Sequence, residues 1–433
     1  MADVPGRGGR YLVDKRRLFH AHPETAFTEF WTVTTIAAEL RRLGLRTLTG
    51  LDAIDLSRAP ALPVQAELDA AAERARAWGA TDADLVPVRE GHTAAVADIE
   101  GTGKGTGPTV AVRVDIDALP LAESADPRHR PAREGFASAD PATMHACGHD
   151  GHIAVGLELA RRLSSGDFTG RVRLLFQPAE EGGRGARAML DAGVLEGVDR
   201  LYALHLGLGL PVGEVAAGTH GFFANAKLRA VFTGRQSHAA AAPEEGRNAL
   251  LAAAQATVGL HALPRFATAD TRVNVGVLRA GTAPNIVAGR AELALELRAS
   301  EGDVCDELER RARTVLDAAG AAGEVEVRID RIGAATTAVC DPAAVRAVAG
   351  AARSLPAVTS VHDDHRFGAS DDATLMMREV QAHGGTATYV VVGASSPAPH
   401  HSPGFDIDES CLGMAADVLE RAVRDALRDK EDA

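Results

Sequence analysis

Four short apolar segments constrain the fold of this chain more than any other feature. They read TVAVRVDI (109–116), RVRLLF (171–176), RLYALHL (200–206) and TATYVVV (386–392), and helical patterns such as GHIAVGLELARRL (151–163) lie between them. Each segment is apolar almost throughout rather than at alternate positions, so both faces of each strand should be covered. The sequence therefore predicts an α/β fold with a mostly parallel sheet.

A different pattern occupies residues 218–332. Its strands and helices follow the order β-α-β-β-α-β, which is typical of a ferredoxin-like domain. Because the α/β pattern resumes afterwards, we interpret this region as an insertion. The predicted organisation is one domain formed by 1–217 and 333–433, with a helical excursion near 55–90, and an inserted domain at 218–332.

The charge balance limits the possible partners. The 433 residues include 46 Lys and Arg against 59 Asp and Glu, a formal net charge of −13. This acidity argues against nucleic acid or an anionic membrane as a partner and leaves small molecules and proteins. The start of the chain has no apolar leader, no segment is long enough to cross a bilayer, and the four cysteines are scattered. We therefore expect a cytoplasmic location with reduced thiols.

Polar residues gather where the predicted strands end. Ligands of parallel sheets bind outside the carboxyl ends of the strands, so these residues should lie close together. The residues in question are Asp115 and Asp117, Glu180 and Glu181, His205, and the pair His400–His401. The segment MHACGHDGH (144–152) adds a cysteine and histidines just before a predicted helix.

Two kinds of chemistry could use this set. A Cys–His nucleophile needs one base and one orienting group, and has no use for paired glutamates and further histidines. A metal ion takes three or four such donors and leaves a position open for water. Five donors exceed one open tetrahedral site and suit two ions that share a thiolate. One glutamate of the pair would then ligate, and its neighbour would act as general base.

The motifs resemble those of the di-metal aminoacylase–carboxypeptidase family, in the amidohydrolase branch that includes hippurate and indole-acetyl-amino-acid hydrolases. The matching stretches are VRVDIDALP, MHACGHDGH, FQPAEEGGRGARAM, ALHLG, GRQSHAAAAPEEGRNAL, GTAPNIVAG and HHSPGFDIDE. The resemblance implies metal-dependent hydrolysis of N-acyl or N-aroyl amino acid amides, with p-aminobenzoyl-glutamate as the expected substrate. The alternatives are a general N-acyl-amino-acid or hippurate-type amidohydrolase, or a non-catalytic metal-binding subunit of a hetero-oligomer.

The same resemblance assigns roles to individual residues. It implies two divalent ions, Mn or Zn, with Glu180 as the general base. Asp117 is implied not to bind the metal itself but to support the residues that do. The implied metal ligands are Cys147, His149, Glu181, His205 and His401. The double histidine leaves His400 as an alternative ligand, although the H-S-P match favours His401. Asp115 stands where other branches have a ligand histidine, and His145 and His152 are interpreted as structural.

The inserted domain is implied to form a two-fold dimer, either with a second copy or with a related subunit. His238 would reach the partner's active site and stabilise the oxyanion. Asn285 and Arg298 match positions near the substrate carboxylate, for which a guanidinium is well shaped. Arg184, four residues after Glu180, is expected on the same helix face as Glu180 and is a candidate for a second substrate carboxylate.

Overall fold

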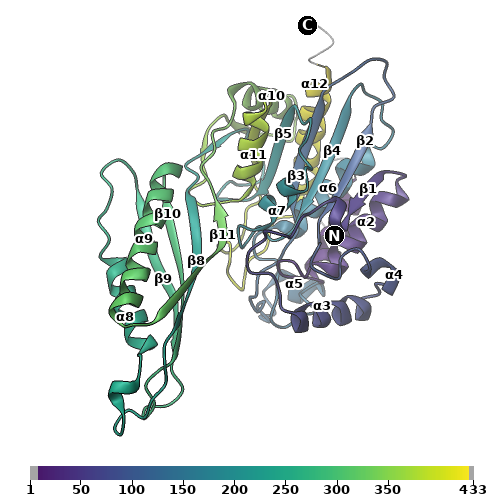
Figure 1. Ribbon diagram of the computed structural model, residues 1–433. Coiled ribbons are helices and arrows are strands. Elements are labelled where there is room, and N and C mark those ends of the chain that lie inside the picture. Colours follow the sequence, from purple (N-terminus) through teal and green to yellow (C-terminus); the bar gives the residue numbers. More distant parts are fainter. Residues whose placement is uncertain (1–7, 429–433) are drawn as a thin grey trace. The chain divides into compact units, whose positions relative to one another are not determined.

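The computed structural model describes residues 8–428 and divides into two compact units (Figure 1). The large unit comprises the residues up to His220, Ala338–Phe367, and the residues from Asp372 onward. The inserted unit comprises Gly221–Thr337 with Gly368–Asp371. The chain thus leaves the large unit, builds the inserted unit, and returns.

The large unit is built on an eight-stranded mixed sheet in the order β1-β2-β4-β3-β5-β14-β6-β12. Its central strands β4, β3, β5 and β14 are mutually parallel, and they are the four apolar segments of the sequence. The strands are β1 (Arg46–Thr49), β2 (Ala95–Glu100), β3 (Thr109–Asp115), β4 (Arg171–Gln177), β5 (Arg200–Leu206), β6 (Glu214–Ala216), β12 (Ser360–His362) and β14 (Thr386–Val392). The predicted α/β fold with a mostly parallel sheet is confirmed.

Helices cover this sheet, and its central strands are therefore buried along nearly their whole length. The helices are α1 (Gly9–His20), α2 (Phe30–Arg42), α3 (Gln65–Ala77), α4 (Asp82–Leu85), α5 (Arg130–Glu134), α6 (His149–Leu163), α7 (Gly185–Asp191), α10 (Pro342–Arg353), α11 (Ala373–Ala382) and α12 (Ser410–Arg428). Helix α6 packs against α1, α12 and β3, and α11 packs against α7, β5 and β14. The region near 55–90 contains α3 and α4, preceded by a short 3-10 turn at Gly50–Asp52.

Helix α6 lies unusually close to the sheet. A β-carbon on Gly156 would come within 2.8 Å of the Phe176 ring, so only glycine permits this approach. The helix begins at His149, directly after Gly148, whose φ of +91° belongs to the left-handed region. This turn brings the Cys147–His149 segment to the carboxyl ends of the central strands.

The inserted unit is a four-stranded antiparallel sheet in the order β11-β8-β10-β9. Its elements are β8 (Ala224–Thr233), a 3-10 turn at Pro243–Glu245, α8 (Ala249–His261), β9 (Thr271–Ala280), β10 (Arg290–Ala299), α9 (Gly302–Ala322) and β11 (Glu326–Ala335). Helices α8 and α9 pack side by side on one face of this sheet (Figure 1). Alternate residues of β10 are buried, as expected for a strand with one covered face. A small two-stranded sheet, β7 (Thr219–His220) with β13 (His365–Arg366), belongs to the large unit.

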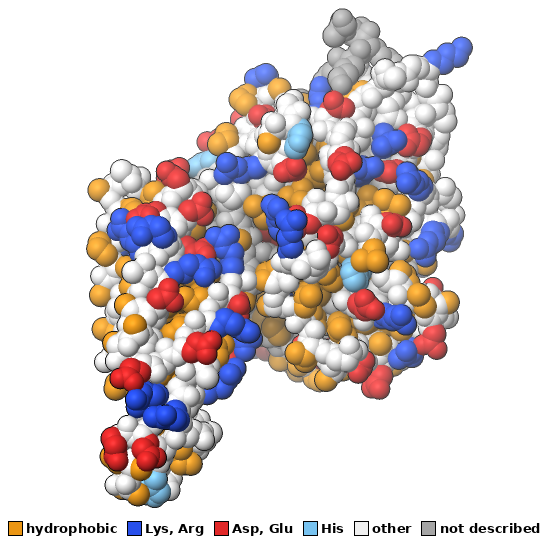
Figure 2. Space-filling model, viewed as in Figure 1, with side chains coloured by type: hydrophobic (Ala, Val, Ile, Leu, Met, Phe, Trp, Pro, Cys, Tyr) orange, Lys and Arg blue, Asp and Glu red, His pale blue; other side chains and the backbone are white. Residues whose placement is uncertain are grey.

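The surface agrees with the mixed charge of the sequence. Figure 2 shows acidic and basic side chains interspersed over the viewed face. Between residues 8 and 428, no helix is both long enough and apolar enough to span a bilayer.

A buried charge network ties the N-terminal helix to distant parts of the large unit. Arg16 on α1 is completely buried, and its guanidinium donates to Asp150 Oδ2 at 2.7 Å, Asp406 Oδ1 at 2.8 Å and Glu409 Oε1 at 3.3 Å. His20, one turn later, lies 2.7 Å from Asp150 Oδ2. Removing the cation would leave the fully buried Asp150 carboxylate without its arginine partner, which is costly, whereas Asp406 and Glu409 would keep their contacts with Arg130 and Arg17.

We expect Arg16→Ala to lower the free energy of unfolding of the metal-free protein by about 3–5 kcal/mol. Urea denaturation followed by circular dichroism measures this change. Arg10→Ala is the matched control, because Arg10 lies on the same helix with its side chain 87% exposed and 3.7 Å from Asp14. That control should change stability by less than about 1 kcal/mol, and an equal loss in both variants would contradict a special role for Arg16.

Candidate metal centre

The predicted site residues of the large unit meet at the carboxyl ends of β3, β4, β5 and β14. Asp115 ends β3, and Glu180 and Glu181 follow β4 by three and four residues. His205 is the penultimate residue of β5, and the His400–His401 pair follows β14. The Cys147–His149 segment enters the same region from the start of α6. The parallel strands thus bring together segments that lie up to about 290 residues apart in the sequence.

Of the groups of three donors that form there among the described residues, two contain Cys147. The ligand atoms of Cys147, His149 and His205 all lie within 4.8 Å of one another, and so do those of Cys147, Glu181 and His401. Cys147 Sγ is 3.5 Å from His205 Nε2, and His401 Nε2 is 3.3 Å from Glu181 Oε2. A sulfur common to two donor groups is the arrangement expected of a thiolate shared by two ions.

The two buried histidines are oriented as metal ligands. His149 Nδ1 is 2.8 Å from the carbonyl oxygen of Asp117, and His205 Nδ1 is 2.8 Å from that of Leu206, so each Nδ1–H donates to a carbonyl. In the neutral ring, Nε2 of each then carries a lone pair, as in ligand histidines whose other nitrogen is held by a carbonyl. His149 Nε2 is also buried without a hydrogen-bond partner among the described residues. The donor set therefore fits a metal ion.

The side chain of Asp117 organises the glutamate pair. Its Oδ1 accepts the N–H of Glu180 at 2.9 Å, and its Oδ2 accepts the N–H of Glu181 at 3.1 Å. The Glu180 carboxylate lies 3.9 Å from His149 Nε2, and these two residues form a further donor group with Glu181. Asp117 therefore contacts both glutamates and, through its carbonyl, His149.

Asp115 is used differently. Its carboxylate accepts from Arg113 Nη1 at 2.7 Å and lies 2.5 Å from His152 Nδ1, while His152 Nε2 accepts the N–H of Leu206 at 2.9 Å. Burial opposes ionisation of Asp115, but His149, Arg113 and His152 together hold the pKa of this carboxyl well below its usual range. Asp115 also lies in a donor group with His149 and His152, yet its two oxygens are already engaged.

Burial and neighbouring charges both shift the pKa values of the ligand side chains. Burial, with Glu181 adding to it, raises the pKa of the Cys147 thiol well above its usual value. Burial and the neighbouring His152 lower the pKa of His205. For His149, burial works against the charged ring, but the Asp115 carboxylate outweighs it and raises the pKa. A divalent cation would reverse the balance at the sulfur, because a coordinating thiol is deprotonated.

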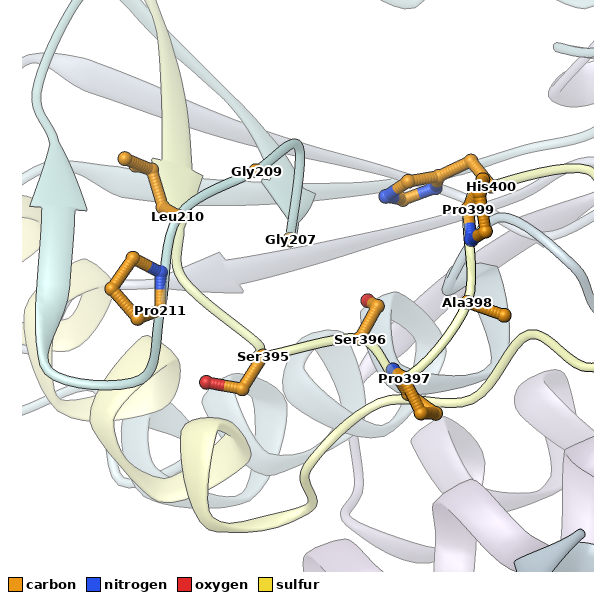
Figure 3. A pocket seen from close by; sticks show the side chains of 10 residues that line it. All are labelled: Gly207, Gly209, Leu210, Pro211, Ser395, Ser396, Pro397, Ala398, Pro399 and His400. Atoms are coloured by element: carbon orange, nitrogen blue, oxygen red, sulfur yellow. The ribbon is translucent and has the colours of Figure 1, made fainter.

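His400 and His401 contact different neighbours. His401 has a φ of +61°, its N–H donates to Ala146 O at 2.8 Å, and its half-exposed ring faces Glu181. His400 Nδ1 is 3.5 Å from Cys147 Sγ, and its Nε2 accepts the N–H of Leu208 at 3.3 Å. Burial lowers the pKa of His400 to about 4. The His400 ring also lines a cavity of about 460 Å³ together with Gly207, the segment Gly209–Pro211 and the segment Ser395–Pro399 (Figure 3).

The expectation that Glu180 and Arg184 share a helix face is wrong. Helix α7 begins only at Gly185, and the preceding residues form a turn. Ala179 (φ +55°) and Gly183 (φ +67°) adopt left-handed backbone, which interrupts a helix. Arg184 instead lies with its guanidinium 5.3 Å from the Phe27 ring centre, and its Nη1 donates to Ala61 O at 2.7 Å.

Glu29 supports the site and was missed by sequence reasoning. This fully buried carboxylate accepts the N–H of Ala179 at 3.0 Å and the hydroxyl of Thr93 at 2.6 Å, so it holds the turn that leads into Glu180. Burial, with Asp117 adding to it, raises its pKa well above the usual value. The only local signal is a carboxylate within the aromatic run FTEFW.

The other predicted residues lie in the inserted unit. His238 and Asn285 are exposed on adjacent loops, where the N–H of Ala239 donates to Asn285 O at 3.1 Å. Arg298, on β10, is half-buried, with its Nη2 2.8 Å from Glu296 Oε1 and its Nη1 donating to Ser370 Oγ at 3.4 Å.

Comparison with known proteins identifies relatives that match nearly the whole chain, among them the following two. The indole-3-acetyl-aspartic acid hydrolase of Enterobacter agglomerans is 44% identical over 407 residues, covering 93% of each chain. One subunit of the p-aminobenzoyl-glutamate hydrolase of Escherichia coli (strain K12) is 43% identical over 409 residues, covering 94% of this chain and 93% of that one. Both relatives are named as hydrolases, one of indole-3-acetyl-aspartic acid and the other of p-aminobenzoyl-glutamate, and they confirm the predicted hydrolase class.

Solved structures share the fold, and two of them are informative here. The aminobenzoyl-glutamate utilization protein from Klebsiella pneumoniae superposes with a TM-score of 0.84 at 39% identity over 96% of each chain. The YxeP protein of Bacillus subtilis, described as a dinuclear metal-binding peptidase of the M20 family, superposes with a TM-score of 0.66 at 25% identity over 97% of this chain and 98% of that one. The family model for peptidase family M20/M25/M40 matches residues 111–425. The chain therefore belongs to peptidase family M20/M25/M40, as the sequence motifs predicted.

Proposed function

We propose that this chain hydrolyses the amide bond between an aromatic acyl group and an acidic amino acid, with p-aminobenzoyl-glutamate as the first substrate to test. The observation that carries the activity is the pair of donor groups that share Cys147, with Glu180 beside them. The substrate class is supported by the two relatives at 43–44% identity, one named for a glutamate conjugate and the other for an aspartate conjugate.

Two divalent ions would be held by the two donor groups, with Cys147 common to both. His149 and His205 would complete one group, and Glu181 and His401 the other. The thiolate favours zinc, and the carboxylate is also suited to manganese. When bound, such ions polarise an amide carbonyl and lower the pKa of water towards 7.

Glu180 would act as the general base. A carboxylate in this place can take a proton from the attacking water and deliver it to the leaving amine nitrogen. Its backbone is fixed by the hydrogen bond to Asp117, and its carboxylate lies 3.9 Å from His149 Nε2. Asp117 would thus position both the base and its ligand neighbour Glu181.

Three residues would bind the carboxylates of the amino acid half. Arg298 and Asn285 would bind the α-carboxylate of the substrate. At Arg298 this carboxylate would compete with the Glu296 side chain for the guanidinium. Arg184 would take the side-chain carboxylate of glutamate or aspartate. Its buried Nε has no hydrogen-bond partner within residues 8–428, so a donor is available for bidentate binding.

The inserted unit would serve as a ferredoxin-like dimerisation and lid domain, in a homodimer or in a heterodimer with a related subunit. The strand order β11-β8-β10-β9 supports the first part of this proposal. The heterodimer is supported by two relatives whose names describe them as one subunit of a hydrolase or a homologue of it. His238 Nδ1 accepts the N–H groups of Ala240 and Ala241 at 3.2 and 3.1 Å. Its neutral ring therefore carries the proton on Nε2, which suits a donor to an oxyanion.

A hydrolysis panel tests the substrate class. The purified chain would be supplied with Mn²⁺ or Zn²⁺ and assayed with p-aminobenzoyl-glutamate, indole-3-acetyl-aspartate, hippurate and N-acetyl-alanine. We expect the two acidic conjugates to exceed the others by about 100-fold or more in kcat/KM, because a guanidinium left without its carboxylate is costly. Equal rates would favour a general N-acyl-amino-acid hydrolase. Bound metal without turnover on any substrate would favour a non-catalytic role in a hetero-oligomer.

We expect His238→Gln to lower kcat by about 10²–10³-fold, the usual cost of one oxyanion donor. If His238 acts in the partner's site, mixing the inactive His238→Gln and Glu180→Gln chains should restore activity, because mixed dimers would contain one site with both residues. Steady-state rates after subunit exchange measure this recovery. His261→Gln, a substitution of an exposed histidine on α8, is the control and should keep full activity. A mixture that stays inactive although its chains exchange would show that His238 does not act in trans.

A further inference from the structure

The double histidine places a second imidazole against the sulfur of Cys147. His400 Nδ1 lies 3.5 Å from Cys147 Sγ, a distance at which an N–H can donate to sulfur. Unlike His401, His400 belongs to neither donor group that shares Cys147 within the described part of the chain. Its hydrogen-bond contact with the site is therefore with the thiol, and its ring also lies beside the His205 ring, with 5.5 Å between the two ring centroids.

The other ring nitrogen fixes the tautomer of His400. Nε2 accepts the backbone N–H of Leu208 at 3.3 Å, so Nε2 must present a lone pair. A neutral imidazole has one proton, and that proton must then be on Nδ1, the atom that faces the sulfur. A ring in this state cannot ligate a metal through Nδ1, because that nitrogen has no lone pair in the ring plane.

The backbone around Leu208 is shaped for this contact. Gly207 and Leu208 both have left-handed φ angles, +86° and +46°, and a β-carbon on Gly207 would lie 3.0 Å from His400 Nε2. Figure 3 shows the His400 ring pointing toward this turn. The turn thus aims an N–H at Nε2 and leaves room for the ring.

The His400 ring is oriented in the opposite way to the rings of the two buried ligand histidines. His149 and His205 each direct Nδ1 to a backbone carbonyl and present Nε2 to the site. His400 directs Nε2 to a backbone N–H and presents Nδ1. All three neutral rings therefore carry the proton on Nδ1, but His149 and His205 present the unprotonated Nε2 to the site, whereas His400 presents the protonated Nδ1.

We propose that His400 donates an Nδ1–H hydrogen bond to the Cys147 thiolate and positions it, while His401 is the metal ligand. This inference rests on the proposed metal site. A hydrogen bond to a thiolate withdraws negative charge from the sulfur and fixes its rotamer, as partners of metal ligands generally do. His400 would thereby set how strongly the shared sulfur donates to both ions.

Cobalt-substituted protein tests the proposal with two matched variants. His400→Asn places an amide N–H where Nδ1–H lies, whereas His400→Leu removes the donor. We expect both variants to bind two Co²⁺ per chain at saturation. In His400→Leu the thiolate-to-cobalt charge-transfer band should move to longer wavelength, and cobalt affinity should fall by about 10- to 100-fold. In His400→Asn both should stay near those of the unsubstituted chain, and His401→Leu should lose one ion.

The outcomes separate this inference from the proposed function. An unsubstituted chain that binds no cobalt would overturn the metal site and this inference together. Two ions in the unsubstituted chain but one in His400→Leu would show that His400 is a metal ligand. An unchanged charge-transfer band in His400→Leu would show that His400 makes no hydrogen bond to the thiolate. Should neither variant fold, ¹⁵N-histidine NMR of the unsubstituted zinc-loaded protein decides. A protonated Nδ1 on His400 supports the proposal, and a metal-bound nitrogen there refutes it.

Discussion

Glu180→Gln is expected to reduce kcat by about 10²–10⁴-fold, the usual contribution of a general base, while metal content stays unchanged. The amide is nearly the same size as the carboxylate, and the backbone hydrogen bond from Glu180 to Asp117 does not involve the substituted group. The substitution should therefore remove the proton acceptor and little else. Steady-state kinetics with p-aminobenzoyl-glutamate and elemental analysis of the same samples measure both quantities.

Glu196→Gln is the matched control, since Glu196 is an exposed glutamate of the large unit that precedes the amino end of β5, whereas the site lies at the carboxyl ends of the strands. It should leave both kcat and metal content unchanged. Unaltered turnover in Glu180→Gln would show that Glu180 is not the general base. Loss of an ion in that variant would instead make Glu180 a ligand, which its membership of a donor group with His149 and Glu181 allows.

Cys147→Ala is expected to bind at most one divalent ion per chain and to lose about 10³-fold or more in kcat/KM. Both donor groups contain Cys147 Sγ, so its removal leaves each group with two donors, below the three or four that a stable site uses. Losing the cations removes several kcal/mol of transition-state stabilisation, and each 1.36 kcal/mol is about tenfold in rate. Elemental analysis of undialysed protein and kinetics in added metal test the two parts.

Cys411→Ala provides the control, because Cys411 is also a fully buried thiol but lies on α12 in the hydrophobic core. It should lower stability modestly and keep its full metal content. Two tightly bound ions in Cys147→Ala would contradict the shared sulfur. Retained turnover of the unsubstituted chain in a strong chelator would contradict metal dependence altogether.

The central sheet and most of the ligand set could be predicted because their signals are local. A strand buried on both faces is apolar at most positions rather than at alternate ones, and this holds for β3, β4, β5 and β14. Parallel strands place their carboxyl ends together, so donors that follow them must converge. The motif spacing then identifies the family without any knowledge of distances.

Three features of the structure could not be predicted in this way. The helix expected to hold Glu180 and Arg184 together is a turn, because left-handed backbone at Ala179 and Gly183 interrupts it. Glu29 holds that turn across about 150 residues of sequence. The buried cation Arg16 meets carboxylates that lie up to 393 positions away. None of these contacts leaves a periodic pattern.

By itself, the sequence determined the family, the parallel sheet and the chemical types of donor, since each depends on residues within one segment. Only the tertiary structure decided that Cys147 is common to both donor groups and that His400 faces the sulfur while His401 faces Glu181. It also decided which ring nitrogen of each histidine presents a lone pair. The reason is physical: tautomers and shared ligands follow from the angles and distances between groups, and folding of distant segments sets these.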